Sequence, residues 1–144
     1  MTTSSRSEKN LLEPLLRWLR AVRRIRTGTV VAKELHWFGR HVDVATLSST
    51  GRLAAYELKI THNGRALEQA AYNRLAFDRS YVVSAREPSE QAMESARSMG
   101  IGVIVVSSGG VRMLLDSPHD RQDPYLRSRL VRLMRATGVA GNRV

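Results

Sequence analysis

Hydrophobic residues near the start of the chain recur with the 3.6-residue period of an amphipathic helix. Between Lys9 and Ile25 the repeating apolar positions are Leu11, Leu15, Trp18, Val22 and Ile25. Arginines occupy the opposite side, and the first helical turn is the place where such a helix tolerates Pro14. We therefore predict a helix over residues 9–25, preceded by a disordered lead over residues 1–8.

The next part of the chain alternates between apolar and polar positions, which is typical of β-strands. Strands are predicted over residues 29–37, 41–47 and 52–60, with a turn at the Ser-Ser-Thr-Gly cluster of residues 48–51. In the second strand, one face is expected to carry Val42, Val44 and Thr46, and the other Asp43 and Ala45. In the third, Ala54, Tyr56, Leu58 and Ile60 lie opposite Leu53, Ala55, Glu57 and Lys59.

The remaining pattern alternates helices with short apolar strands. The predicted elements are helix 65–77, strand 80–84, helix 88–99, strands 101–106 and 111–115, helix 124–137, and a tail over residues 138–144. An antiparallel meander followed by crossover units predicts an α/β fold, with a mixed central β-sheet flanked by helices on both faces. We expect a single domain over residues 9–137.

Composition limits the class of protein. The chain has 144 residues, 42% of them hydrophobic, which suits one domain with a real core. No apolar run approaches the roughly 18 residues of a membrane span, and the first residues lack the apolar centre of a signal peptide. There is no cysteine. We therefore expect a cytoplasmic protein with no membrane segment.

The net charge of +10 is concentrated at the two ends of the chain. Residues 1–26 carry seven basic and two acidic side chains, and residues 119–144 carry six and two. This distribution favours a polyanionic partner, most simply nucleic acid, although a solvated arginine-rich surface is an equally good interpretation. Lysine occurs only at Lys9, Lys33 and Lys59, so a lysine at a chemically special position is less easily attributed to chance.

Two carboxylates are predicted to face each other across the hairpin of residues 41–60. If the turn centres near residue 50, cross-strand partners have numbers that sum to about 100, which places Asp43 opposite Glu57. Facing carboxylates repel, and a divalent cation such as Mg²⁺ or Mn²⁺ would offset that repulsion. Lys59 lies on the same face, where it could contact a phosphate and orient the attacking water. The set is suited to phosphodiester hydrolysis.

These residues resemble a known catalytic signature. Asp43 followed by Glu57-Leu58-Lys59 is similar to the motif of the PD-(D/E)xK, or restriction-endonuclease-like, superfamily, with Val42 in place of its proline. The predicted element order matches the αβββαβ core of that superfamily. The resemblance implies that Glu34 supplies a further acid and that Gln69, on the helix after the motif, assists.

The resemblance implies a metal-dependent DNA endonuclease, structure-selective or weakly sequence-selective, acting in repair, recombination or defence. Small members of this fold often dimerise, so a homodimer is one expected assembly. The DNA contacts predicted from the basic helix faces and the loop after the third strand are Arg17, Arg20, Arg24, Arg127, Arg132 and His62. The alternatives are a non-catalytic DNA-binding module of the same fold and a subunit that cleaves only within a larger complex.

Overall fold

A mixed β-sheet forms the centre of the protein in this computed structural model, which describes residues 4–60, 64–120 and 123–144. Across those ranges the sheet has seven strands in the order β6-β5-β4-β3-β2-β1-β7. The strands are β1 (Val30–Trp37), β2 (Arg40–Leu47), β3 (Leu53–Lys59), β4 (Arg79–Ser84), β5 (Gly102–Ser107), β6 (Gly110–Leu115) and β7 (Val139–Ala140). The neighbours β3–β4 and β4–β5 are parallel and the other pairs antiparallel, which confirms the predicted mixed sheet.

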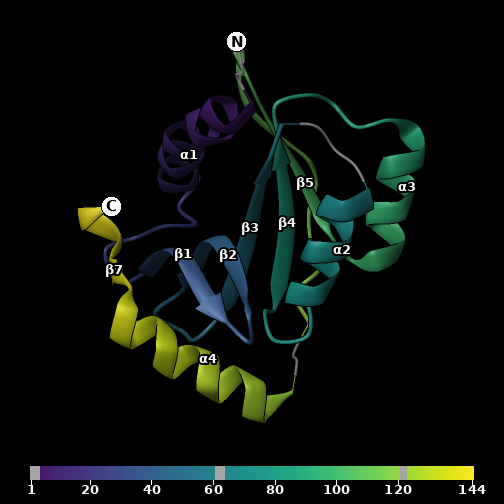
Figure 1. Cartoon of the computed structure of the whole chain (residues 1–144). Coiled ribbons are helices and arrows are strands. Elements are labelled where there is room, and N and C mark those ends of the chain that lie inside the picture. The colour runs from purple at the N-terminus through teal and green to yellow at the C-terminus, as the bar shows by residue number, and fades with distance from the viewer. Residues whose placement is uncertain (1–3, 61–63, 121–122) are drawn as a thin grey trace.

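Helices cover both faces of the sheet. They are α1 (Ser4–Ala21), α2 (Gly64–Asn73), α3 (Glu90–Met99) and α4 (Pro124–Thr137), with a short 3₁₀ turn at Gly141–Arg143. Figure 1 shows α2 and α3 side by side near β4, at the right of the view. Helix α1 stands apart from them at the upper left, and α4 runs along the bottom. None of the helices in the described ranges is both long and apolar enough to cross a bilayer.

Among the residues that the structure describes, three apolar clusters fill the space between the sheet and the helices. The α1 core joins α1 to one sheet face through Leu15, Val44, Tyr56 and their neighbours. The α4 core lies under α4 and includes Ala45, Ala55, Phe77 and Met134, and a third cluster packs α2 and α3 on β4 and β5. In β3, Tyr56 and Leu58 belong to the α1 core while Leu53 and Ala55 belong to the α4 core, so the predicted alternation of this strand is confirmed.

Helix α1 begins earlier and ends earlier than the periodicity predicts. It runs from Ser4 to Ala21, so Pro14 lies in its interior rather than in its first turn. Proline removes one intrahelical hydrogen bond there, and packing of Leu11 and Leu15 in the α1 core compensates. Ile25 lies in the loop that follows and is buried in the same core. Its apolar side chain therefore continues the helical period of the sequence, although the residue is not part of the helix.

The segment after α4 is part of the sheet. Residues 138–144 were expected to form a tail, but Val139 and Ala140 pair with β1 and extend the sheet beyond it. The amide of Gly141 donates to the carbonyl oxygen of Thr29 at 2.6 Å, and a Cβ at Gly141 would lie 2.2 Å from the carbonyl oxygen of Arg26. Two residues carry too little apolar periodicity to indicate a strand, so the sequence pattern does not reveal this one.

Candidate active site

The candidate site lies where β2 and β3 stop pairing. Their register includes Val44 opposite Tyr56 and Ala45 opposite Ala55, so the predicted hairpin register is confirmed. Asp43 and Glu57 occupy the next positions along the two strands, close enough that the charge of Asp43 adds to burial in raising the pKa of Glu57. The structure therefore brings these two acids to one point.

Glu57 is a buried acid with few compensating contacts. It is 2% exposed, and one of its oxygens, Oε2, accepts a hydrogen bond from Nδ2 of Asn73 at 3.1 Å. Burial and the neighbouring charge of Asp43 raise the pKa of Glu57 to about 7, although Asn73 and Lys59 pull it down. The site thus holds a carboxylate that lacks sufficient positive charge nearby.

The raised pKa makes the stability of the fold depend on pH. The pKa of Glu57 is about 7 in the folded state, compared with an ordinary value of 4.5. The free energy of unfolding should therefore fall as the pH rises from 4.5 to about 7. The Glu57→Gln variant removes this penalty, so at about pH 8 it should be more stable than the wild type by about 3 kcal/mol. The difference should vanish near pH 4. Urea unfolding at both pH values measures it, and a variant less stable than the wild type at high pH would contradict the assignment.

Asp43 is held by the backbone of β3. The amide of Leu58 donates to Oδ2 of Asp43 at 2.7 Å, and Nε2 of His41 lies 3.5 Å from Oδ1. The Asp43 side chain is 24% exposed, so it lies between the buried Glu57 and the surface. This arrangement fixes the carboxylate at the point where the strands diverge.

The side-chain alternation of β2 breaks at Asp43, which corrects the predicted faces. Val42 belongs to the α4 core and Val44 to the α1 core, although strict alternation would place them together. The same shift occurs in β1, where Ala32 and Leu35 share the α4 core at a spacing of three. Glu34 lies between two regularly paired positions of the β1–β2 ladder and has a left-handed backbone (φ 54°). This irregular conformation accounts for the change of side-chain faces in both strands.

Lys59 completes the acid–acid–lysine set on β3. It lies two residues after Glu57 and therefore on the same side of the strand. Its charge lowers the pKa of Glu57. In the described part of the chain Lys59 has no salt bridge, and its side chain is half-buried. Its ammonium is therefore available to an incoming anion.

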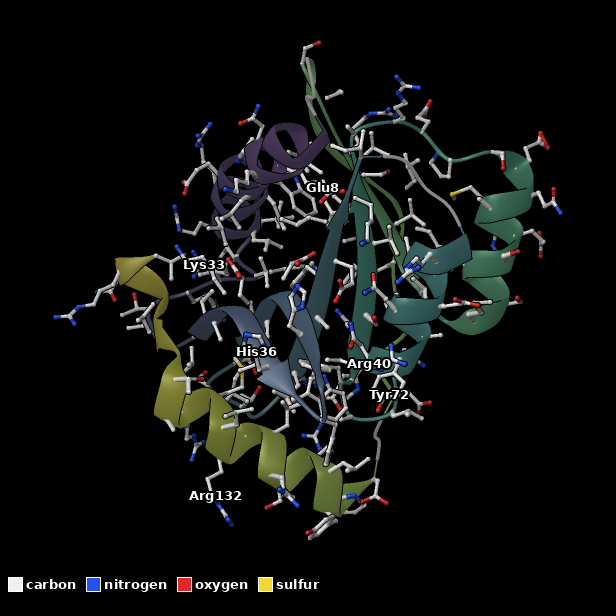
Figure 2. The ribbon with its side chains drawn as sticks, viewed as in Figure 1. Glu8, Lys33, His36, Arg40, Tyr72 and Arg132 are labelled. Carbon is white, nitrogen blue, oxygen red and sulfur yellow. The ribbon has the colours of Figure 1, made fainter. Side chains whose placement is uncertain are left out.

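A cavity of about 380 Å³ opens beside Asp43 on the α1 side of the sheet. Glu34 and His41 line it, as does Glu8 from α1, which Figure 2 shows on the side of the helix near the strands. Glu8 was missed by sequence reasoning because it fell in the expected disordered lead. Its spacing of three and four residues from Leu11 and Leu12 was the available signal, since it places Glu8 on the face of α1 that packs on the sheet.

Helix α2 presents two amide side chains toward β3. Asn73 contacts Glu57, as described above, and was not anticipated. Gln69 lies one turn earlier on the same helical face, and its Oε1 is buried without a hydrogen-bond partner among the described residues. Such an orphaned acceptor is uncommon in a folded protein and fits a missing donor or cation. Tyr72 instead packs on Trp37 and under the guanidinium of Arg40, 3.8 Å away (Figure 2).

The arginines predicted to contact DNA divide into exposed and internally bound groups. Arg17 and Arg132 are exposed, and Figure 2 shows Arg132 pointing away from the sheet. Arg20 donates to the carbonyl oxygen of Val144 at 3.0 Å. Arg24 donates to Tyr81 and pairs with Asp116, and Arg127 pairs with the buried Asp78.

Arg127 is held in an ion pair with a buried acid and Arg24 in a partly exposed one, so contact of these two residues with DNA stays a prediction that would compete with those pairs. Periodicity places both on the outer side of a helix, but it carries no information about acids that other elements bring to them. His62 lies outside the described residues.

The carboxylate pair fits a magnesium-type cation better than a zinc-type site. Within the described ranges, no group of three or more His, Cys, Asp or Glu side chains is arranged to hold a metal. Mg²⁺ often uses one or two carboxylates and takes its remaining ligands from water and substrate, whereas structural zinc needs four protein ligands. Burial and then repulsion by Asp43 raise the pKa of Glu57, and a divalent cation would relieve that repulsion.

Comparison with solved structures finds matches for this chain. A protein of unknown function from Silicibacter pomeroyi, SPO1766, has a TM-score of 0.66 and 20% identity, covering 88% of this chain and 82% of that one. SfsA from Pyrococcus furiosus, solved in complex with Ca²⁺, has a TM-score of 0.45 and 12% identity, covering 81% of this chain and 65% of that one. The likeness to SPO1766 concerns the fold alone. No family model and no curated protein matches the chain.

Proposed function

We propose that this protein is a metal-dependent endonuclease that hydrolyses phosphodiester bonds in DNA. The observation that carries the proposal is the adjacency of Asp43 and Glu57 where β2 and β3 stop pairing, with Lys59 on the same side of β3 as Glu57. The buried Glu57 beside Asp43 destabilises the fold, because burial removes hydration from the carboxylate and the two charges repel each other. A bound divalent cation would offset this cost and engage a phosphate.

Each residue has a distinct role in this proposal. Asp43 and Glu57 hold Mg²⁺ or Mn²⁺, and their bonds to Leu58 and Asn73 keep one oxygen of each in a fixed orientation. When bound, the cation supplies charge that stabilises the phosphate in the transition state and acidifies water. Lys59 donates to a phosphate oxygen and orients the attacking water. Gln69 and Glu34 assist from α2 and from the wall of the cavity beside Asp43.

The proposed substrate is double-stranded or branched DNA, recognised through its backbone. The exposed Arg17 and Arg132 lie on α1 and α4, which cover opposite faces of the sheet. A single duplex contacting both would have to pass an edge of the molecule, and a homodimer would offer two such surfaces. The described connections between strands and helices are short, so selection by DNA structure is favoured over readout of base sequence.

Nicking of supercoiled and branched DNA tests the proposal. The wild type should nick the substrate in Mg²⁺ or Mn²⁺ and should lose all activity in EDTA, because the acid pair needs a divalent cation to engage phosphate. Gel mobility with the same DNA in EDTA reports binding separately. Binding without nicking in either cation would contradict the enzyme and favour the non-catalytic module or the subunit of a larger complex.

A further inference from the structure

A second cavity, of about 260 Å³, lies along the first half of β3, where Leu53, Ala54 and Tyr56 line it. The loop after α1 and the turn between β2 and β3 form its walls, and Tyr56 and Arg79 contribute from β3 and β4. Its basic lining residues are Arg23, Arg24, Arg26, Arg52, Arg79 and His119. Asp78 also lines it, but its charge is taken up by Arg127. The cavity therefore has a large excess of positive charge.

Among the described residues, most of these arginines form no salt bridge. Arg24 is bound to Asp116, but no salt bridge involves the other four arginines of the lining, Arg23, Arg26, Arg52 and Arg79, anywhere in the described ranges. Arg79 is half-buried, and its Nε is buried without a hydrogen-bond partner among the described residues. A buried guanidinium nitrogen without an acceptor is unfavourable, and a bound anion would supply that acceptor.

The backbone at Arg23 is a second, independent sign. Arg23 has a φ of 64°, the left-handed conformation that usually falls to glycine just after a helix. For a residue with a side chain this conformation costs roughly 1–2 kcal/mol. Here it carries a charged side chain that lines the cavity. Strain retained at a position where glycine would be easier is a reason to look for a function of the side chain.

Hydroxyl groups add neutral donors to the same cavity. The turn presents Ser48 and Thr50, whose oxygens are 3.0 Å apart, and the amide of Arg52 donates to the Ser48 hydroxyl at 3.0 Å. Burial raises the pKa of Tyr56 to about 12, so its hydroxyl remains a protonated donor at neutral pH. Guanidinium forks combined with hydroxyl donors match the oxygens of a phosphate group.

We propose that this cavity binds a phosphate group, carried either by a free phosphomonoester such as a nucleotide or by the backbone of a nucleic-acid strand. It is a separate site from the acid pair, even though Tyr56 in its lining directly precedes Glu57, because these two side chains leave β3 on opposite sides. The cavity also opens on the Tyr56 side of β3, whereas Glu57 belongs to the other side. The proposal does not depend on catalysis by Asp43 and Glu57.

Calorimetric titration in EDTA and low salt tests the site without cleavage. The probes are inorganic phosphate, a deoxynucleoside 5′-monophosphate, and a short single-stranded DNA without terminal phosphates. Arg23→Gly and Arg52→Gln should each weaken binding about tenfold, because each removes one charged hydrogen-bond donor. Arg97→Gln removes the same charge from exposed α3 and should leave binding within about twofold of the wild type.

Arg23→Gly also separates binding from folding. The glycine relieves the left-handed backbone, so the thermal unfolding midpoint should stay the same or rise while phosphate affinity falls. Cavity-dependent binding of phosphate or the nucleotide assigns the site to a free phosphomonoester, and binding of the oligonucleotide alone assigns it to a strand backbone; either supports the proposal. The proposal is overturned if none of the three probes binds, or if Arg97→Gln weakens binding as much as the cavity variants.

Discussion

Replacing Lys59 with alanine is expected to reduce DNA nicking at least about 100-fold while leaving DNA binding nearly unchanged. The ammonium is the one proposed catalytic group that carries positive charge, and it stands two residues from Glu57 with no salt bridge in the described part of the chain. Its loss removes a donor to the phosphate. It also raises the pKa of Glu57 further, since Lys59 lowers that pKa in the wild type.

The Lys59→Arg variant distinguishes these two effects. Arginine keeps the positive charge beside Glu57, but its planar guanidinium cannot reproduce the geometry of an ammonium. Nicking should therefore stay low in Lys59→Arg if the ammonium acts on the phosphate or the water, and should recover if charge alone is needed. Nicking by Lys59→Ala at the wild-type rate would contradict a catalytic role for Lys59 in either form.

Replacing Arg127 with alanine is expected to destabilise the fold by about 3–5 kcal/mol. Arg127 pairs with Asp78, whose side chain is 1% exposed, and also donates to the carbonyl oxygen of Gly51 at 2.7 Å. The other oxygen of Asp78 accepts from the amide of Leu53 at 2.8 Å. Removing the guanidinium leaves a buried carboxylate without its counter-charge, which is more harmful than removing the whole pair.

Thermal unfolding measures this effect, and a chain of this size should lose roughly 10–20 °C in its midpoint. Arg132→Ala is the matched control, because it removes an exposed arginine from the same helix and should shift the midpoint by only a degree or two. If Arg127→Ala and Arg132→Ala had equal midpoints, the ion pair between Arg127 and Asp78 would not stabilise the fold.

The parts of the site that sequence reasoning predicted are those fixed by strand periodicity and turn length. The serine- and glycine-containing turn sets the hairpin register, which the structure reproduces at Val44 and Tyr56. With the register known, Asp43 and Glu57 must lie at neighbouring positions. Period-two alternation then places Lys59 beside Glu57, since β3 has no irregularity.

Other parts depend on tertiary contacts that no local pattern encodes. The left-handed backbone at Glu34 shifts the faces of β1 and β2 together, and glutamate gives no warning of it. Arg127 has the same helical phase as a solvent-facing residue, and only the fold brings Asp78 to it. The sequence pattern places Glu8 in a disordered lead, because Pro14 makes an earlier helix start unfavourable.

The most direct test of the carboxylate pair is a titration of Mn²⁺ into the protein at about pH 8, above the pKa of Glu57, followed by calorimetry. The wild type should bind one cation, and Glu57→Gln should bind it at least about tenfold more weakly, because one of the two charged ligands is gone. Asp43→Asn should behave like Glu57→Gln. Equal affinity in the wild type and both variants, or no binding by the wild type, would contradict a metal centre at Asp43 and Glu57.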